Sequence, residues 1–370
     1  MIRTCSAHSR LAALTMLLGS GWLTAAHATE GYYRDPAIHG DTVVFTAEGD
    51  LWRVPLSGGV AMRLTRHPGV ESQASISPDG QWIAFAASYD GAEEVYVMPT
   101  TGGQPTRLSF DHARVWVQPW SPDGKVVYAT DAGHGLWNVR SLRTIDPASG
   151  KREDIPLADA SQGVIADDGS IWFTRMGLHL STDNAIAYQG GAAGRIWHYT
   201  PGSDEAARLD PPSASSDTDP MWHAGEVIFV SNASGRPALW TMHADGSART
   251  QLTRHAELSV SDPSEHNGNV VYQFGGDLRV FQLADRSDRR LQIDLASDFD
   301  PRRERWIDKP LSYFEGVAID GKGQRAVLNV RGGSAVFGPE SMRRAVLPVP
   351  GEPLTPLRNP GSRRSARFAG

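Results

Sequence analysis

The phrase Ser-Pro-Asp-Gly occurs twice in this chain, and each copy leads into a run of β-branched and aromatic residues. The first copy begins at Ser77 and the second at Ser121. A Pro-Asp-Gly turn followed by such a run predicts a β-hairpin. Recurrence after about 40–45 residues is typical of a β-propeller, in which each copy builds one four-stranded blade.

Weaker copies of this unit also occur, and the total between about Arg34 and Leu295 is six copies. A glycine-containing turn precedes a short apolar strand in each copy, at Gly40, Gly80, Gly124, Gly169, Gly225 and Gly268. A later strand of each copy carries an apolar or apolar–aromatic pair, at Leu51-Trp52, Val95-Tyr96, Leu136-Trp137, Ile196-Trp197, Leu239-Trp240 and Leu278-Arg279-Val280. We expect these aromatic residues to pack between neighbouring blades. The predicted fold is an all-β, six-bladed β-propeller over residues 29–297.

The order of strands within the copies predicts how the ring closes. The array begins with an innermost strand near Arg34–Ile38 and ends with an outermost strand near Arg290–Leu295. We expect the first blade to pack on the last without sharing a strand. One copy is longer than the others because residues 175–194 are inserted into it. This insertion is either a tolerated surface loop or a functional loop on one face.

The first 28 residues read as an export signal. Arg3 and Arg10 form a basic start, and an apolar stretch follows. This stretch is short and is interrupted by glycine and serine, so we expect no stable membrane insertion. Ala26-His27-Ala28 fits a small-residue cleavage site. We predict cleavage after Ala28 and a periplasmic or secreted mature protein.

Charge and cysteine content restrict the classes of partner. The sequence has a net charge of −6, yet residues 301–370 hold 13 Lys and Arg against 6 Asp and Glu. The preceding region is therefore strongly acidic, which argues against nucleic acid as a partner. The basic tail residues are scattered, as on a solvated surface. The single cysteine, Cys5, lies in the export signal, so the mature chain has neither a disulfide nor a thiolate metal site.

The repeat breaks at residues 298–310, which we interpret as a linker. Residues 311–370 then read as the incomplete first blades of a second propeller. Its first two strands are expected within Leu311–Gly323 and Arg325–Gly332, and a later one near Ala345–Leu347. A lone blade leaves unpaired strand edges. We therefore expect the sequence to be cut off within this second array, and residues beyond about Lys309 to be poorly packed.

This order of six blades, an Arg-rich linker and a second array resembles the N-terminal half of tricorn-type proteases. The second array opens with a strand that ends in Val330-Arg331-Gly332. The Ser-Pro-Asp-Gly blade motif is also shared with TolB-like propellers. The resemblance implies a serine protease core of the S41 type, in which the propellers control passage of peptides to and from a catalytic chamber. It also allows a homo-oligomer for the full-length protein.

No residue of this chain matches a catalytic position of that family, whose serine and histidine lie in the C-terminal half. The sequence has no Gly-x-Ser-x-Gly elbow, no His-Glu-x-x-His helix and no phosphate-binding loop. Acidic pairs such as Asp167-Asp168-Gly169 lack the spacing of a calcium loop and read as turns. We therefore assign no catalytic, cofactor-binding or metal-binding residue. Trp116 and Trp120 stand outside the aromatic repeat and are candidates for an exposed or channel position.

Three hypotheses follow for function. The first is the gating region of an exported tricorn-like serine protease, inactive as a peptidase without the catalytic core. The second is a periplasmic TolB-like propeller that binds a protein partner. The third is an enzyme acting inside the propeller channel, which requires polar residues that converge on the inner strands. The sequence shows no such convergent set, so peptides or a protein are the expected partners.

Overall fold

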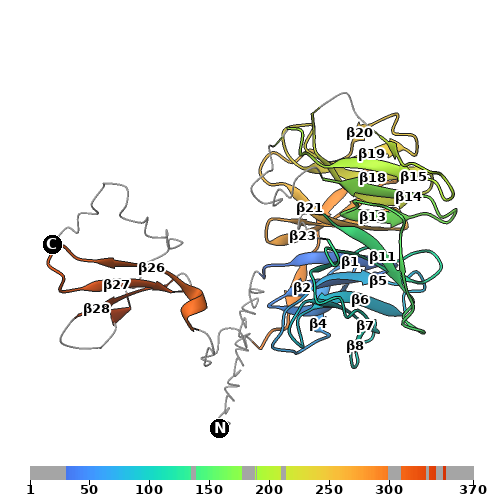
Figure 1. The fold of residues 1–370 in the computed structure, drawn as a ribbon. Helices are drawn as coiled ribbons and strands as arrows, with labels where there is room; N and C mark the ends of the chain where they lie inside the picture. The colour runs from blue at the N-terminus through green and yellow to red at the C-terminus, as the bar shows by residue number, and fades with distance from the viewer. Residues whose placement is uncertain are drawn as a thin grey trace, which may run out of the picture. The chain divides into compact units, whose positions relative to one another are not determined.

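The computed structural model describes residues 31–134, 139–176, 188, 190–209, 214–298, 310–330, 333–338 and 345–346. The chain divides into two compact units, with the boundary between Asp298 and Phe299. The described parts of both units consist mainly of antiparallel β-sheets, shown in Figure 1. The predicted all-β fold is confirmed.

Within the described residues of the first unit, six sheets each contain four antiparallel strands that are consecutive in sequence. The first two sheets contain β1 (Arg34–His39), β2 (Thr42–Ala47), β3 (Asp50–Pro55) and β4 (Gly59–Arg63), then β5 (Glu71–Ile76), β6 (Trp82–Ala87), β7 (Glu94–Pro99) and β8 (Thr106–Arg107). The next two contain β9 (Val115–Val117), β10 (Val126–Thr130), β11 (Ser141–Ile145) and β12 (Arg152–Asp154), then β13 (Gln162–Ile165), β14 (Ile171–Arg175), β15 (Arg195–Tyr199) and β16 (Ala207–Arg208). The last two contain β17 (Asp217–His223), β18 (Glu226–Ser231), β19 (Ala238–His243) and β20 (Thr250–Gln251), then β21 (Val260–His266), β22 (Asn269–Phe274), β23 (Asp277–Gln282) and β24 (Asp288–Arg290).

The ring closes differently from the prediction. A further strand, β25 (Ile293–Leu295), leaves the sixth sheet and pairs in parallel with β4 of the first sheet. The first and last segments therefore share a sheet, and the expectation of closure without a shared strand is wrong. The approach is close, because a Cβ on Gly58 would lie 2.5 Å from the backbone oxygen of Gln292. Gly58 also has φ +90°, a conformation that favours glycine.

Replacing Gly58 with alanine should therefore loosen the closing strand. The left-handed backbone alone costs roughly 1–2 kcal/mol for a residue with a Cβ, and the contact with Gln292 adds to it. We expect a loss of about 2 kcal/mol in the free energy of unfolding, together with faster cleavage near residue 292 in limited proteolysis. Gly133→Ala is the control, because Gly133 has φ +81° but nothing within 4 Å of its Cβ position. Equal destabilisation of the two variants would show that the close approach is unimportant.

The Ser-Pro-Asp-Gly segments form the predicted turns between the first two strands of a sheet. In the second sheet, the Gly80 N–H donates to the Ser77 carbonyl at 2.8 Å, and the Trp82 N–H donates to Ser77 Oγ at 2.9 Å. The third sheet repeats this arrangement at Ser121. The serine thus accepts one hydrogen bond at its carbonyl from within the turn and one at its Oγ from the following strand. The glycine supplies the positive φ that closes the turn. This explains why the phrase recurs.

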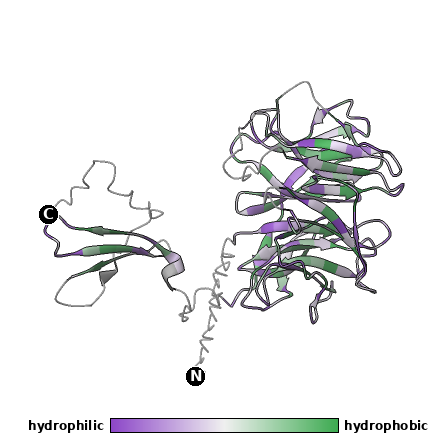
Figure 2. Ribbon diagram, in the orientation of Figure 1, coloured by the Kyte–Doolittle hydropathy of each residue, from purple (hydrophilic) through white to green (hydrophobic). Residues whose placement is uncertain are grey.

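The hydrophobic core lies between neighbouring sheets, where the apolar strand centres meet (Figure 2). The repeating aromatic residues share core clusters with residues of the preceding sheet, and they are Trp52, Tyr96, Trp197 and Trp240. Their predicted packing between sheets is confirmed. The extent of burial differs, because Trp52 is 1% exposed whereas Trp240 is only partly buried.

One detail of the repeat lies elsewhere than expected. The third strand of the third sheet is β11, at Ser141–Ile145, and not at Leu136-Trp137. Leu136 and Trp137 lie outside the described residues. Most of the 175–194 insertion also lies outside them. Where the insertion returns to the sheet, the Asn232 side-chain amide donates to the Tyr188 carbonyl at 3.1 Å. This bond ties the described end of the insertion to the fifth sheet.

The second unit contains a blade-like sheet of its own. A 3₁₀ turn at Pro310–Tyr313 leads into β26 (Phe314–Ile319), β27 (Ala326–Val330), β28 (Gly333–Phe337) and β29 (Ala345–Val346), which pair in that order. These strands lie where the sequence predicted the opening of a second array. Val317 and Ile319 are 49% and 68% exposed, so β26 has little apolar cover among the described residues.

Candidate functional site

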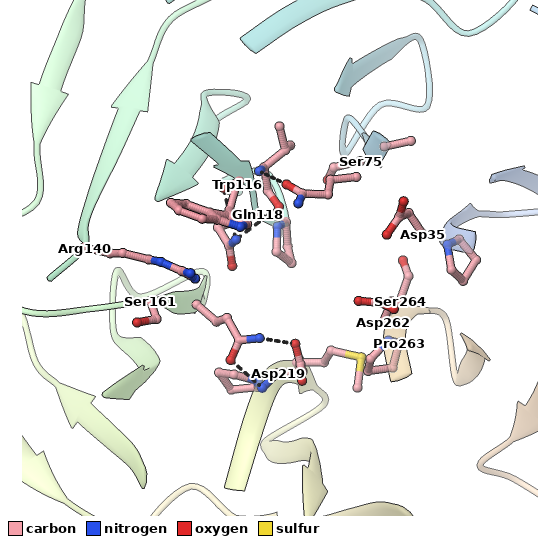
Figure 3. A pocket seen from close by; sticks show the side chains of 18 residues that line it. Asp35, Ser75, Trp116, Gln118, Arg140, Ser161, Asp219, Asp262, Pro263 and Ser264 are labelled. Carbon is pink, nitrogen blue, oxygen red and sulfur yellow. Dashed lines mark hydrogen bonds between the residues drawn. The ribbon is translucent and has the colours of Figure 1, made fainter. Parts of the chain in front are cut away.

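The innermost strands of the six sheets surround a central cavity of about 170 Å³ (Figure 3). Every inner strand or the segment next to it supplies lining residues. One Asp or Gln comes from each sheet, at Asp35, Gln73, Gln118, Gln162, Asp219 and Asp262. A convergent polar set therefore exists, and the expectation that the sequence contains none is wrong. We call these six residues the Asp/Gln ring.

Local backbone geometry directs much of this ring toward the channel. Four of its members have a left-handed backbone, with φ values of 48°, 54°, 53° and 48° at Asp35, Gln73, Asp219 and Asp262. Each lies where the pairing of the inner strand with its neighbour shifts by one residue. Such bulges reorient side chains, and left-handed non-glycine residues are concentrated at functional sites. The lining is thus a repeated structural feature.

The ring also joins consecutive sheets. The Val117 N–H donates to Gln73 Oε1, the Gly163 N–H to Gln118 Oε1, and the Asp219 N–H to Gln162 Oε1, each at 3.1 Å. In each pair the acceptor belongs to one sheet and the donor to the next. Inner strands have a free edge whose N–H groups need partners. The ring supplies three of these partners and thereby links the second to fifth sheets along the channel wall.

The two sides of the channel differ in charge. Trp116 and Arg140 lie on one side, while Asp35 and Asp262 lie on the other (Figure 3). The Arg140 guanidinium lies 3.5 Å from the centre of the Trp116 ring, which is a cation–π contact. Burial, with a smaller contribution from nearby Arg114, lowers the pKa of Arg140 to about 10, so it stays charged at neutral pH.

Trp116 and Trp120, the two tryptophans outside the aromatic repeat, have different positions. Trp116 lines the channel, as predicted for this pair of residues. Trp120 does not, because it is 7% exposed and packs in the core, with its Nε1–H donating to the Ser75 carbonyl at 3.0 Å. Trp120, named as a candidate for an exposed or channel position, has neither.

Burial raises the pKa of the ring carboxyls for which a shift is resolved. It raises the pKa of Asp35, opposed by the charge of Arg34 and by the Gln73 N–H. It also raises the pKa of Asp219, opposed by hydrogen bonds from Thr218 and Gln162. Charge on this side of the channel is therefore costly unless a cation or a donor lies nearby.

The titratable groups of the lining are of two kinds. Among the described residues that line the cavity there is no histidine, lysine or cysteine, and the titratable side chains are those of three aspartates and Arg140. Within the described residues, no group of three or more His, Cys, Asp or Glu could hold a metal ion. No described helix is long and apolar enough to cross a membrane. The channel offers acceptors, an aromatic face and one buried cation.

A buried carboxyl pair lies away from the channel, between the first two sheets. Glu71 is fully buried and Asp50 is 2% exposed. Tyr89 Oη and Thr65 Oγ1 donate to the Glu71 carboxyl at 2.7 and 3.0 Å. Burial and the nearby Asp50 raise the pKa of Glu71 to about 7. Two buried carboxyls this close cannot both ionise without a penalty.

This pair should make stability depend on pH. A carboxyl whose pKa is raised in the folded state stabilises the fold at low pH, and this contribution is lost as pH rises through about 7. We expect Glu71→Gln to reduce the stability lost between pH 6 and 8.5 by about 1.4 kcal/mol. Urea titrations at both pH values measure it, with exposed Glu257→Gln as control. Identical pH dependence in the wild type and Glu71→Gln would contradict the raised pKa of Glu71.

Sequence reasoning missed the ring, although a signal was present. In four of the six copies, the ring residue precedes proline, at Asp35-Pro36, Gln118-Pro119, Asp219-Pro220 and Asp262-Pro263. Proline has no N–H and is tolerated at bulges and free strand edges. A recurring Asp-Pro or Gln-Pro at the start of four copies therefore marked the channel wall.

Known proteins share this architecture. Tricorn protease homolog 1 of Streptomyces coelicolor is 29% identical over 327 residues, covering 83% of this chain and 29% of the relative. The tricorn protease homolog of Saccharolobus solfataricus is 24% identical over 298 residues, covering 79% of this chain and 27% of the relative. This chain therefore spans less than a third of the length of these curated relatives.

Solved structures agree in fold. The crystal structure of the tricorn protease superposes with a TM-score of 0.70 at 19% identity, covering 87% of this chain and 32% of that chain. TolB from Acinetobacter baumannii gives a TM-score of 0.50 at 20% identity, covering 63% and 56%. The family model of the tricorn protease N-terminal beta propeller domain matches residues 30–287. The resemblance and the β-propeller architecture are confirmed, and this chain belongs to the family of tricorn protease N-terminal β-propeller domains.

Proposed function

We propose that this propeller controls the passage of extended peptides to or from a tricorn-type peptidase, and that it has no peptidase activity by itself. The observation that carries the proposal is the Asp/Gln ring, a polar wall built at the same position in all six sheets. Polar side chains from every sheet suit an extended backbone of any sequence. The described lining has no histidine, lysine or cysteine, which agrees with a passage.

We also propose that the protein is exported, with cleavage after Ala28. The support is the basic start, the apolar stretch and the small-residue cleavage site of residues 1–28. N-terminal sequencing of protein recovered outside the cytoplasm should then begin at Thr29. Recovery of an intact Met1 terminus in the cytoplasmic fraction would contradict export.

A second candidate function is the binding of a folded protein, as in a TolB-like propeller. Large apolar side chains are exposed in four segments that lead into inner strands. They are Tyr32, Val70, Phe110 and Leu258, with exposures of 62%, 52%, 65% and 45%. Because all inner strands begin at one end of the ring, these side chains lie at that end. Exposed apolar side chains gathered at one end fit a protein surface.

Site-specific photo-crosslinking separates the two functions. A benzophenone amino acid would replace Trp116 in the channel, Leu258 at the apolar end or exposed Trp82, in the full-length chain. Peptide passage predicts that an unstructured 20-residue peptide crosslinks at position 116 and not at 82. Crosslinks to a folded protein at position 258, with none to the peptide at 116, would favour the TolB-like function and overturn the passage.

A further inference from the structure

Histidines end the inner strands of three consecutive sheets. They are His223 of β17, His266 of β21 and His39 of β1, in the fifth, sixth and first sheets. Each contacts the following sheet: His223 meets Glu265 of the sixth sheet, His266 meets Gly40 of the first, and His39 meets Pro78 of the second. The contact of His266 crosses the seam at which the ring closes.

The seam contact requires a neutral ring on His266. The Gly40 N–H donates to His266 Nδ1 at 3.0 Å, so this nitrogen must have a free lone pair. His39 Nε2 lies 3.0 Å from the Pro78 carbonyl, which can only accept, so that nitrogen carries the hydrogen. If His266 Nδ1 carried a proton, it would be a donor facing another donor, the Gly40 N–H. The hydrogen bond across the seam would then break.

Neighbouring groups reinforce this sensitivity. The rings of His39 and His266 lie 4.1 Å apart, so charge on both would cause repulsion. Burial and His39 lower the pKa of His266, which means that the closed seam opposes protonation. His39 in turn lowers the pKa of Asp79 of the second sheet, after the larger effects of hydrogen bonds from Ser77 and Gln81. Asp41, next to Gly40 in the same turn, is exposed.

Glu265, the partner of His223, contributes to stability with the opposite dependence on pH. His223 Nδ1 lies 2.8 Å from Glu265 Oε1, which also accepts from the Gly268 N–H. Burial raises the pKa of Glu265, so its contribution to stability is lost as pH rises. The lowered pKa of His266 has the opposite sign, because its contribution is present above the unfolded pKa and is lost on acidification. Acid should therefore weaken the contact of His266 with Gly40 but not the contact that Glu265 makes.

We propose that the contact of His266 with Gly40 and His39 is an acid-sensitive latch on the inner side of the closing seam. Acidification releases this contact between β21 and β1, while the backbone pairing of β25 with β4 keeps the outer rim closed. The two strands that the latch joins also carry Asp262 and Asp35 of the channel wall. The latch therefore couples external pH to the channel lining.

Hydrogen–deuterium exchange of the full-length chain at pH 7.5 and 5.5 tests the latch. Protection factors, corrected for intrinsic exchange at each pH, would be measured for the segment that contains Gly40. Loss of one hydrogen bond to a side chain predicts a fall of about tenfold at pH 5.5. The hairpin of β9 and β10, which contains no histidine, is the internal reference and should change little. Unchanged protection of the Gly40 segment would overturn the proposal.

Two variants identify the group that titrates. His266→Asn places an amide oxygen where Nδ1 accepts and does not titrate in this range, so its protection should not fall at pH 5.5. His39→Gln keeps a donor toward Pro78 and removes the second ring, so its fall should be smaller than in the wild type. His243→Asn, an exposed histidine outside the seam, should behave like the wild type. If His266→Asn and His39→Gln both lose protection as the wild type does, the latch is refuted.

Discussion

Replacing Trp52 with alanine should lower the free energy of unfolding by about 3–5 kcal/mol, the largest loss expected from one apolar substitution in this chain. Trp52 is 1% exposed and packs in the cluster that joins the first and sixth sheets. Its indole N–H also donates to the Ala47 carbonyl at 2.9 Å. The variant therefore loses buried surface and a buried hydrogen bond at the closing seam. Urea denaturation monitored by circular dichroism measures the loss.

Trp82→Ala is the matched control for this prediction. Trp82 occupies a strand position that carries polar residues in the other copies, and it is 41% exposed. We expect its removal to change stability by about 0.5 kcal/mol or less. Similar losses for Trp52→Ala and Trp82→Ala would contradict the packing of the seam. A loss below 1 kcal/mol for Trp52→Ala would do so as well.

At neutral and alkaline pH, Arg249→Met should lower the free energy of unfolding about as much as Trp52→Ala does. Arg249 Nη2 lies 2.5 Å from Asp217 Oδ2, and the side chain of Asp217 is fully buried. Removal of one partner of a buried ion pair costs about 3–5 kcal/mol, because the remaining charge is left without compensation. Burial already raises the pKa of Asp217, so acid should relieve the penalty by protonating it. The loss of stability should thus be smaller at pH 5 than at pH 8.

A double-mutant cycle separates this effect from packing. Arg249 also lies 4.6 Å from the centre of the Phe229 ring, a contact that methionine partly replaces. Asp217→Asn combined with Arg249→Met should recover much of the stability lost in the single variant. A double variant as unstable as the sum of the singles, with no dependence on pH, would show that the ion pair does not matter.

Local features of the fold could be predicted because they depend on short-range chemistry. The turns at Ser77 and Ser121 follow from serine, aspartate and glycine at fixed spacing, and the structure contains the expected hydrogen bonds. The aromatic positions Trp52 and Tyr96 follow from strand alternation. One element was misplaced in the third sheet, where ten residues separate β10 from β11. When the connection between two strands is long, the local sequence does not indicate where the second strand begins.

The closing strand and the channel could not be derived in the same way. Ile293-Asp294-Leu295 reads like any outer strand, and its partner β4 lies more than 230 residues earlier. Nothing local distinguishes a parallel pairing across the seam from an antiparallel one within the sixth sheet. The Asp/Gln ring forms only when six distant segments meet, and its side chains depend on bulges. The Asp-Pro and Gln-Pro repeats were its only trace in the sequence.

Closure of the ring is the claim on which the channel depends, and disulfide trapping tests it most directly. Val60 and Asp294 face each other in the parallel pair of β4 and β25, and both are exposed. In a Cys5→Ser background, Val60→Cys with Asp294→Cys should form a disulfide under mild oxidation within the monomer. Met62→Cys with Asp294→Cys, two residues out of register, should form it far more slowly. Equal rates for the two pairs, or no bond between positions 60 and 294, would contradict a ring closed by this strand.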